Sequence, residues 1–425
     1  MNAQVSFLVS VTPPRRRIDP LVYQQPLEVT FQRTTSILTF YLQDGTYTLI
    51  HIPLSLYSTL LQPILRVLLP QSQGTGGLRD SPEYELQGLT PDGQHGFLNI
   101  SITPLECSVV CHTSWAQNVF EPVLKAMPRD TAKTVSVSKE SYMVLSVISA
   151  GLDAGGRVME LTSPLALAGI PIFFITTYYS DFILVPTKER ENVVKSLIAK
   201  GFELSDNESN FITSAANHKQ GAGLSATSPP HEGLPLNVAE LQTRIFGTLK
   251  KRHVAPQIEE TLELVQCSGR EASQLANFTH QRPSISRHAT GNGRRPSWAD
   301  NVDTKLYTCI ISALVSQPRF MSVTLAQDDP PSLLLDKNLL YIFGDSLVGD
   351  TDASLIPIFL DLKTLPLEAT GIVCGVAGIL VQDTQIAASS ELSYLSTAQA
   401  GAVILSEEQS VRAMGILKPL LSEEL

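Results

Sequence analysis

A short polar segment inside an apolar stretch carries side chains suited to holding a small molecule. Thr176-Thr177-Tyr178-Tyr179-Ser180-Asp181 interrupts two apolar runs with hydroxyl groups and one carboxylate. Hydroxyls and backbone amides can bind a ligand's carboxylate, and an aspartate can bind its ammonium group. The sequence therefore offers a candidate site for a small zwitterion at Thr177, Tyr178, Ser180 and Asp181. The same residues equally fit a capped hairpin in which Asp181 bonds its own backbone.

Other patterns that could carry chemistry are weaker. The segment Gly151-Leu-Asp-Ala-Gly155-Gly156 follows an apolar run and suits either an anion contact or a tight turn. Cys107, Cys111 and His112 lack the second ligand pair that zinc sites use, so buried structural cysteines are expected. The sequence has no Gly-Lys-Ser/Thr phosphate loop and no recognisable nucleophile motif or carboxylate pair. We predict no catalytic residue, no metal and no cofactor, and thus a protein that is not an enzyme.

Composition indicates a folded, acidic protein. Of 425 residues, 43% are hydrophobic, and 31 basic against 41 acidic side chains give a net charge of −10. This balance argues against a nucleic-acid partner. Five scattered cysteines favour a reducing compartment over a disulfide framework. The uncharged segment 161–180 contains Pro164, Gly169 and Pro171, which favour a helix end and a strand over a membrane span. We expect a cytoplasmic protein without a secretory signal.

One order of elements is clearest between residues 141 and 204. Apolar periodicity predicts strands at 142–148, 170–177, 181–185 and 202–204, and helices at 157–168 and 188–200. Gly169 stands where a helix C-cap is expected. The order βαββαβ is that of a ferredoxin-like unit of about 65 residues.

The C-terminal part repeats this order. Strands are predicted at 355–362, 392–397 and 402–405, and helices at 371–381 and 407–421. The run ITTYYSDFILVPTKE aligns with LSTAQAGAVILSEEQ, which pairs Thr177 with Thr397. Two weaker copies are predicted within residues 46–126 and 262–335. Such repetition is the mark of a fold built from copies of one unit.

The predicted fold class is therefore α+β, with four tandem ferredoxin-like modules in two pairs and long disordered insertions. The predicted divisions are a first module at 1–136 with an N-terminal extension and a loop at 71–96, a second at 137–204, a linker at 205–236, a third at 237–350 with a disordered insertion at 269–301, and a fourth at 351–425. The loop at 71–96 is rich in Gly, Gln, Asp and Pro, the linker in Ser, Ala, Asn, Gly and Pro, and the insertion at 269–301 in Ser, Arg and Asn.

Two stretches resemble a known family. Ser163-Pro-Leu-Ala and Ile170-Pro-Ile-Phe-Phe-Ile-Thr-Thr-Tyr-Tyr-Ser-Asp-Phe-Ile-Leu-Val185 look like the second ACT domain of the CASTOR family of cytosolic arginine sensors. Gly371-Ile-Val-Cys-Gly-Val-Ala-Gly378 and Leu395-Ser-Thr397 resemble that family's fourth ACT domain. The extra length of this chain fits a fungal-type relative. The resemblance implies a non-enzymatic amino-acid sensor that inhibits a regulatory complex upstream of the TOR kinase until ligand releases it. A homodimer is a further expectation.

The resemblance also implies where a ligand would bind. It places the site between the second and fourth modules, at Glu160, Leu161, Gly371, Ile372, Thr397, Ala398 and Gly401. Two acidic contacts of the family are replaced here, one at Ala369 and one at Gly401. An arginine ligand would leave its guanidinium unpaired unless Glu160 replaced that charge from the opposite wall. The pseudo-symmetric pocket at Thr177 to Asp181 is the alternative site, and a scaffold with a decayed pocket is the alternative function.

One modification site is a further expectation. Arg294-Arg295-Pro296-Ser297 places two arginines shortly before a serine in a basic segment. Phosphorylation of Ser297 by a basophilic kinase would invert the local charge. A plain solvated linker explains the same residues.

Overall fold

The computed structural model describes residues 28–33, 36–43, 45–69, 95–149, 154–200, 234–269, 303–327, 329–387 and 392–422. Most of each predicted insertion, the predicted strand at 202–204 and Ser297 lie outside these residues. The mixture of helices and antiparallel strands fits the predicted α+β class.

Four segments share the order strand, helix, strand, strand, helix, and are called here the first to fourth units. The first comprises β3 (Tyr47–Ile52), η1 (Leu54–Leu56), α1 (Tyr57–Leu68), β4 (Phe97–Ile102), β5 (Cys107–His112), α2 (Thr113–Trp115), η2 (Ala116–Phe120), α3 (Glu121–Ala126), α4 (Arg129–Ala132) and β6 (Ser136–Val137). The second comprises β7 (Tyr142–Ser149), α5 (Ala154–Leu167), β8 (Phe173–Thr176), β9 (Asp181–Pro186), η3 (Thr187–Glu189) and α6 (Arg190–Ala199).

The other two units follow the same order. The third comprises β11 (Leu264–Gly269), α11 (Thr304–Val315), β12 (Met321–Ala326), β13 (Ser332–Asp336), η5 (Lys337–Leu339), α12 (Leu340–Phe343), η6 (Gly344–Ser346) and β14 (Leu347–Val348). The fourth comprises β15 (Leu355–Asp361), α13 (Ile372–Leu380), α14 (Thr384–Ala387), β16 (Ser393–Ser396), β17 (Ala400–Ser406) and α15 (Glu407–Leu421).

The strands pair into a closed antiparallel ring made of two half-sheets. The first and third units form one half, in the order β3-β5-β4-β12-β13-β11. The second and fourth units form the other half, in the order β7-β9-β8-β16-β17-β15. The halves meet where Tyr47 pairs with Tyr142 and where Leu264 pairs with Leu355. Units far apart in sequence are thus joined edge to edge.

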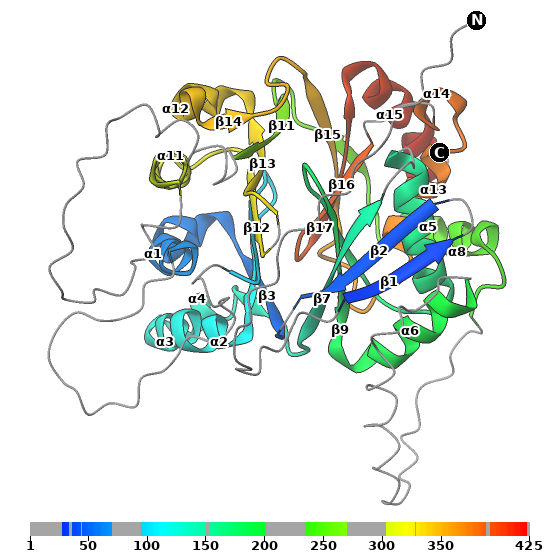
Figure 1. Cartoon of the computed structure of the whole chain (residues 1–425), viewed down its shortest axis with the longest axis horizontal. Helices are drawn as coiled ribbons and strands as arrows, with labels where there is room; N and C mark the ends of the chain where they lie inside the picture. The colour runs from blue at the N-terminus through cyan, green and yellow to red at the C-terminus, as the bar shows by residue number, and fades with distance from the viewer. Residues whose placement is uncertain are drawn as a thin grey trace, which may run out of the picture.

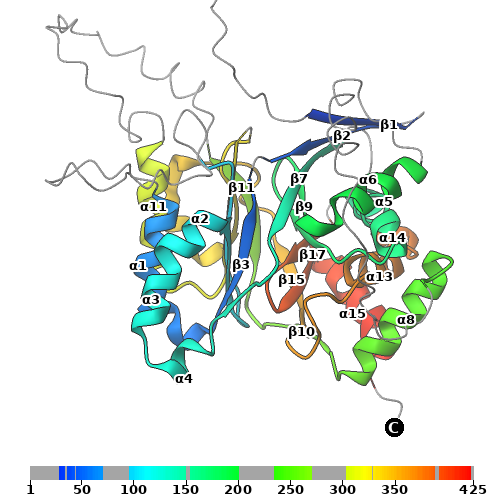
Figure 2. The same ribbon diagram turned by 90° about the horizontal axis from the view of Figure 1, so that it is seen from below.

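Each half-sheet is covered by helices on its outer face. Figures 1 and 2 show α1, α2, α3 and α11 on one side of the molecule and α5, α6, α8, α13 and α15 on the other. The inner faces of the two halves share one apolar core, which includes Tyr47, Phe97, Phe182 and Phe359. Because both faces of a strand are buried, strands such as β4, β5, β9 and β13 are buried along their whole length.

Central strands of the second and fourth units are joined by side chains as well as by backbone pairing. The Phe174 amide donates to Ser396 Oγ over 2.9 Å, and the Tyr394 amide donates to Thr176 Oγ1 over 3.0 Å. The two bonds mirror each other across the junction of β8 and β16. This reciprocity supports the predicted alignment of the two units.

Several of the elements were not predicted from the sequence. A hairpin of β1 (Glu28–Arg33) and β2 (Ser36–Leu42) extends the sheet beyond β7. The helix α8 (Val238–Lys251) and the strand β10 (Pro256–Ile258) lie in the predicted third module. However, β10 pairs with β15, and α8 packs against the helices of the second and fourth units. Gly169 does adopt the predicted C-cap conformation, with φ of +70°.

Candidate functional site

The groove expected between the second and fourth units is covered by α8. Gly371 begins α13 with φ of +80°, and a Cβ added to it would lie 2.8 Å from Leu241 Cδ1 of α8. One turn further on, a Cβ on Gly375 would lie 3.1 Å from Ile245 Cγ2. The absence of side chains at these glycines lets α8 sit directly on α13. Space that a ligand would need beside Gly371 is therefore filled by an aliphatic side chain.

A third glycine extends this close contact. A Cβ on Gly378 would lie 2.7 Å from both Gln242 Nε2 and Met159 Sδ. Met159 Sδ also lies 4.0 Å from Cys374 Sγ, so α5, α8 and α13 meet along one line. The spacing of Gly371, Gly375 and Gly378 is the sequence signal that could have revealed a helix packed here.

Near Gly401, another residue of the predicted ligand site, the space for a ligand is occupied by a tyrosine side chain. The Tyr394 hydroxyl lies 2.5 Å from where a Cβ of Gly401 would be. Tyr394 is 1% exposed, and its hydroxyl has no hydrogen-bond partner among the described residues. Burial raises the pKa of Tyr394. An acidic residue at position 401 would collide with this ring. The position of Tyr394 therefore requires a glycine at 401.

The remaining residues of the predicted groove divide between two places. Leu161 is fully buried in the helix-side core, and Ile372 packs against that core. Glu160 is half-buried on α5 and has its own interactions. Thr397 and Ala398 instead contact the first unit, as described below. The structure therefore does not gather the predicted residues around one open space.

At the alternative site the Asp181 carboxylate lies against an arginine of the same unit, although Asp181 Oδ1 and Arg157 Nε make no hydrogen bond among the described residues. The Arg157 Nε lies 2.5 Å from Asp181 Oδ2, and Asp181 is 2% exposed. Burial raises the pKa of Asp181 to about 6, although the charge of Arg157 and a hydrogen bond from Thr176 oppose the shift. Asp181 therefore forms an ion pair with an arginine, where the sequence offered either a ligand ammonium or its own backbone.

The turn beside Asp181 closes on itself. Thr177 Oγ1 donates to the Ser180 carbonyl over 2.7 Å, and the Ser180 amide donates back to Thr177 Oγ1 over 3.2 Å. The Tyr178 amide donates to Ser332 Oγ of the third unit over 2.9 Å. The Thr177 hydroxyl and the backbone groups of Tyr178 and Ser180 thus have structural roles in this turn.

The matching turn in the fourth unit repeats this geometry against the first unit. The Thr397 amide donates to the Ala400 carbonyl over 2.9 Å, as the Thr177 amide does to Ser180. The Ala398 amide donates to Ser108 Oγ over 3.1 Å, which mirrors the bond from Tyr178 to Ser332. The sequence alignment of Thr177 with Thr397 is confirmed by these equivalent contacts.

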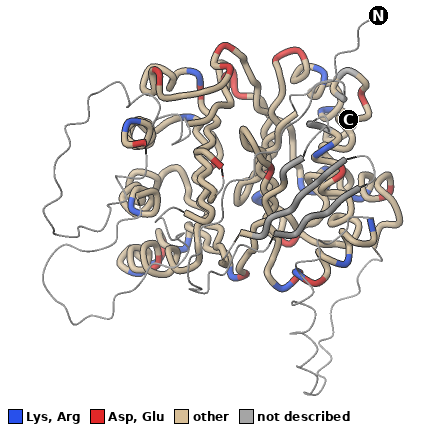
Figure 3. Tube along the Cα trace, viewed as in Figure 1, with Lys and Arg blue, Asp and Glu red and all other residues tan. Residues whose placement is uncertain are grey.

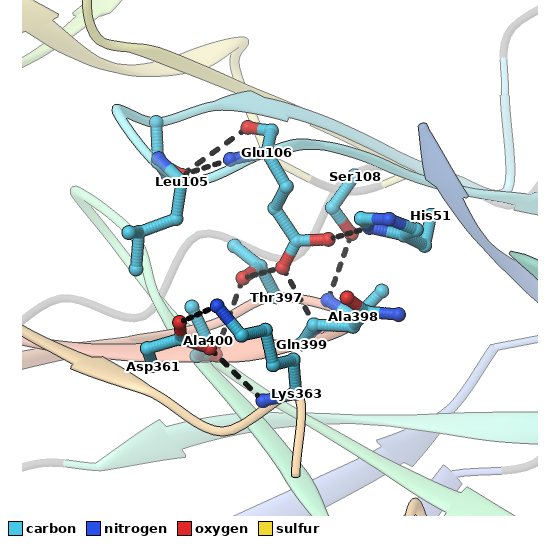
Figure 4. Close-up of polar contacts among 11 residues, drawn as sticks. His51, Leu105, Glu106, Ser108, Asp361, Lys363, Thr397, Ala398, Gln399 and Ala400 are labelled. Carbon is cyan, nitrogen blue, oxygen red and sulfur yellow. Dashed lines mark hydrogen bonds and ion pairs between the residues drawn. The ribbon is translucent and has the colours of Figure 1, made fainter. Parts of the chain in front are cut away.

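A buried glutamate distinguishes the fourth unit's turn from its counterpart. Glu106 is 1% exposed. Its Oε1 accepts from Thr397 Oγ1 over 2.6 Å and from the Gln399 amide over 2.7 Å, and His51 Nδ1 donates to its Oε2 over 2.5 Å (Figure 4). Three donors thus converge on one buried carboxylate. Sequence reasoning missed Glu106 and His51, because nothing local links them to a turn almost 300 residues away.

Beside this network a pocket of about 60 Å³ opens between the first and fourth units. Its lining comes from β3, β6, the segment after β15 and the turn after β16, namely Leu49, His51, Ser136, Ser138, Leu362, Lys363, Leu365, Leu367, Ala398 and Gln399. Lys363 Nζ lies 2.7 Å from Asp361 Oδ2, and this pairing raises the pKa of Lys363. Only Ala398 of the predicted ligand contacts lies on this pocket.

Other candidate chemistry is not assembled in the described residues. The cysteines are free, and Cys107 and Cys111 are buried in the first unit's core, where burial raises the pKa of both thiols. His112 Nδ1 bonds Ser114 Oγ over 2.9 Å. Within the described ranges no three His, Cys, Asp or Glu side chains group as metal ligands. Nor does any described helix combine the length and apolarity needed to cross a membrane.

The comparisons with known proteins bear on the second unit. Residues 137–199 match the model of the ACT domain family. This segment is an ACT domain. It contains β7, α5, β8, β9 and α6, and its bounds lie within the predicted second module at 137–204. An ACT domain indicates regulation by binding of a small molecule, typically an amino acid. No curated protein matches the chain.

Some solved structures show weak likeness to the chain or to part of it. A protein from Agobacterium tumefaciens is 21% identical over 37% of this chain and 84% of its own, with a TM-score of 0.21. The aspartate kinase from Synechocystis is 10% identical over 91% of this chain and 56% of its own, with a TM-score of 0.26. A possible transport protein from Vibrio cholerae is 14% identical over 39% of this chain and 90% of its own, with a TM-score of 0.21. TM-scores this low do not support a fold assignment, so the description of the fold depends on the strand pairing given above.

Proposed function

We propose that the chain is a non-enzymatic regulatory protein that binds an amino acid and thereby controls its association with a protein partner. The observation that carries the proposal is the ACT domain at residues 137–199. All four units are proposed to be ACT domains, in the pairs first–third and second–fourth. Their shared element order and the equivalent turns at Thr177 and Thr397 support this assignment.

The partner and compartment are proposed from the family resemblance. The runs at residues 163–185 and 371–378 resemble the CASTOR arginine sensors. We assign the chain to the cytoplasm and its partner to the regulatory complexes upstream of the TOR kinase. Arginine is a poor ligand for the groove at Gly371, because Leu241 and Tyr394 fill it and no acid stands at position 401.

A scaffold is the second candidate function. The observation that favours it is the packing of α8 on Gly371 and Gly375, together with the Tyr394 hydroxyl beside Gly401. A scaffold would keep the partner surface and bind no small molecule.

A thermal-shift screen of the purified chain against the twenty amino acids separates the two functions. A ligand at a hundred times its Kd adds about 2.7 kcal/mol to the stability of the folded state, which raises the melting temperature measurably. A sensor gives a shift with one amino acid or a small chemical group of them. If every amino acid leaves the melting temperature unchanged, the scaffold is the function.

A further inference from the structure

We infer that the pocket between the first and fourth units, beside Glu106, binds a small aliphatic carboxylate. This inference rests on the proposed function and gives that function a site other than the groove at Gly371. The carboxylate would belong to a free amino acid or to a simple carboxylic acid of similar size. A space of about 60 Å³ holds about four to six water molecules, so it suits a compound of a few carbon atoms.

The turn that lines the pocket lacks two aromatic residues that the equivalent turn of the second unit carries. In the second unit, the equivalent turn carries Tyr178 and Tyr179, whose rings stack edge-on at 4.8 Å between centroids. Tyr178 Cε2 lies 2.9 Å from where a Cβ of Gly349 would be, so its ring covers the third unit's edge. In the fourth unit, Ala398 and Gln399 occupy these positions and line the pocket. The fourth unit's turn thus carries small and polar side chains where the second unit's turn carries two aromatic rings.

His51 lines the pocket, and a hydrogen bond holds its imidazole in one orientation. Glu106 Oε2 accepts from His51 Nδ1 and so fixes the orientation of the imidazole. His51 lines the pocket with only 12% of its side chain exposed. The structure shows no hydrogen bond to Nε2 from another described residue, so this nitrogen is left for a ligand and can accept from an ammonium group. A carboxylate pairing that orients a histidine in this way is common where the imidazole's second nitrogen binds something else.

The lining of the pocket includes a cation and apolar surface. Lys363 Nζ has three donors and shares one with Asp361, so two remain for a carboxylate. Figure 4 shows Lys363 near Gln399, which belongs to the turn that Glu106 holds. Leu49, Leu362 and Leu365 supply surface for a short aliphatic side chain. A lining of lysine and amide donors together with leucines matches a small aliphatic amino acid better than an arginine.

Occupancy of the pocket would strengthen the contact between the two half-sheets. The turn at 397–400 already bonds Glu106 and Ser108 of the first unit through Thr397, Ala398 and Gln399. A ligand that bridges this turn and His51 would bind only when the turn is docked. The first and fourth units would then be held more firmly together, which is a change that a partner protein could sense.

The test compares ligand binding by the full chain and three variants, read by calorimetric titration and thermal shift. Ala398→Tyr fills the pocket with the side chain found at the equivalent turn. Lys363→Met removes the cation at similar length. Tyr179→Gln changes the equivalent exposed position of the other turn and is the matched control. The probes are the twenty amino acids and, separately, carboxylic acids of two to five carbons.

We expect at least tenfold weaker binding in Ala398→Tyr and in Lys363→Met, and unchanged binding in Tyr179→Gln. If Ala398→Tyr fails to fold, Lys363→Met decides. Amino-acid binding that is equally strong in all variants would overturn this site and leave the proposed function standing. Binding of carboxylic acids without amino acids would uphold the pocket and overturn the function. No binding of either class to the unaltered chain would overturn both.

Discussion

The Thr397 hydroxyl donates to Glu106, 291 residues earlier in the chain, over 2.6 Å in a fully buried setting. This bond joins the last unit of the chain to the first. It has no counterpart at the second unit's turn, where Thr177 bonds only within its own turn. The asymmetry between two otherwise equivalent junctions marks the first–fourth junction as the place where this fold departs from its own repeat.

Removal of the Glu106 carboxylate should destabilise the fold strongly. Glu106→Ala leaves the donors of His51, Thr397 and Gln399 without their acceptor, and each buried unsatisfied donor costs about 1–3 kcal/mol. We expect a loss of about 3 kcal/mol in the free energy of unfolding, measured by urea denaturation. Glu106→Gln should lose about 1 kcal/mol, since its oxygen can still accept and His51 can change tautomer.

The matched control for this prediction is an exposed glutamate. Glu121 pairs with Lys125 over 2.7 Å on the surface of α3. Glu121→Ala should change the stability by less than about 1 kcal/mol. Equal effects of Glu121→Ala and Glu106→Ala would show that the buried network contributes nothing special.

Gly401 and Tyr394 should behave as a coupled pair. Gly401→Ala places a methyl group 2.5 Å from the Tyr394 hydroxyl and should cost about 1–3 kcal/mol. Tyr394→Phe removes a buried hydroxyl without a described partner, so alone it should be neutral or stabilising. The double variant should recover most of the loss, as measured in a thermodynamic cycle of urea unfolding. Strict additivity of the two changes would contradict the contact.

The packing of α8 on α13 predicts opposite effects on stability for substitutions at two other glycines. Gly375→Leu should push α8 away from α13 and cost about 2–3 kcal/mol, because a Cβ already lies 3.1 Å from Ile245 Cγ2. Gly247→Ala, within α8 itself, meets nothing within 4 Å and should stabilise the helix by about 0.5–1 kcal/mol. Limited proteolysis at Lys250 and Lys251 should be faster only in Gly375→Leu. Similar cleavage rates in both variants would contradict the packing of α8.

Asp181 should make the fold less stable as pH rises from about 4 to about 6. Its folded pKa is raised to about 6, so the folded state keeps a proton that the unfolded chain releases near pH 4. The contribution to stability is full below pH 4 and is lost through pH 6, by about 3 kcal/mol. Asp181→Asn should remove this loss, as shown by denaturation of both proteins at several pH values.

His95 acts in the opposite direction over nearly the same pH range. Burial lowers its pKa to about 4, so the unfolded chain binds protons that the folded state does not, and stability rises with pH. In Asp181→Asn the His95 effect should remain, so the variant's stability should climb more steeply with pH than that of the unaltered chain. Parallel pH curves for the two proteins would contradict the assignment to Asp181.

Local signals in the sequence were sufficient for most elements. Alternating and helical periodicity located the long strands and the helices α5, α6, α13 and α15 of the second and fourth units within a few residues, but missed α14. Gly169 ended its helix as expected. β17 begins at Ala400, two residues before the prediction, because Ala400 and Gly401 pair with β15 despite their low strand propensity. Pairing across the sheet overrides such local preference.

The site was harder to predict because its decisive contacts are not local. α8 is amphipathic, but nothing in its own residues shows that it packs on Gly371. Glu106 looks like an ordinary turn acid until the fourth unit's turn is placed against it. The charged residues in Figure 3 are spread over the helices and loops with both signs interspersed, so surface charge gave no guide to the site either.

The stoichiometry of amino-acid binding tests the central claim most directly. The two turns are equivalent by repeat, but Tyr178 covers one junction and Ala398 leaves the other open. Calorimetric titration of the unaltered chain with the amino acid that gives the largest thermal shift should therefore show one site per chain. Two equal sites per chain, or no heat of binding with any amino acid, would contradict the account.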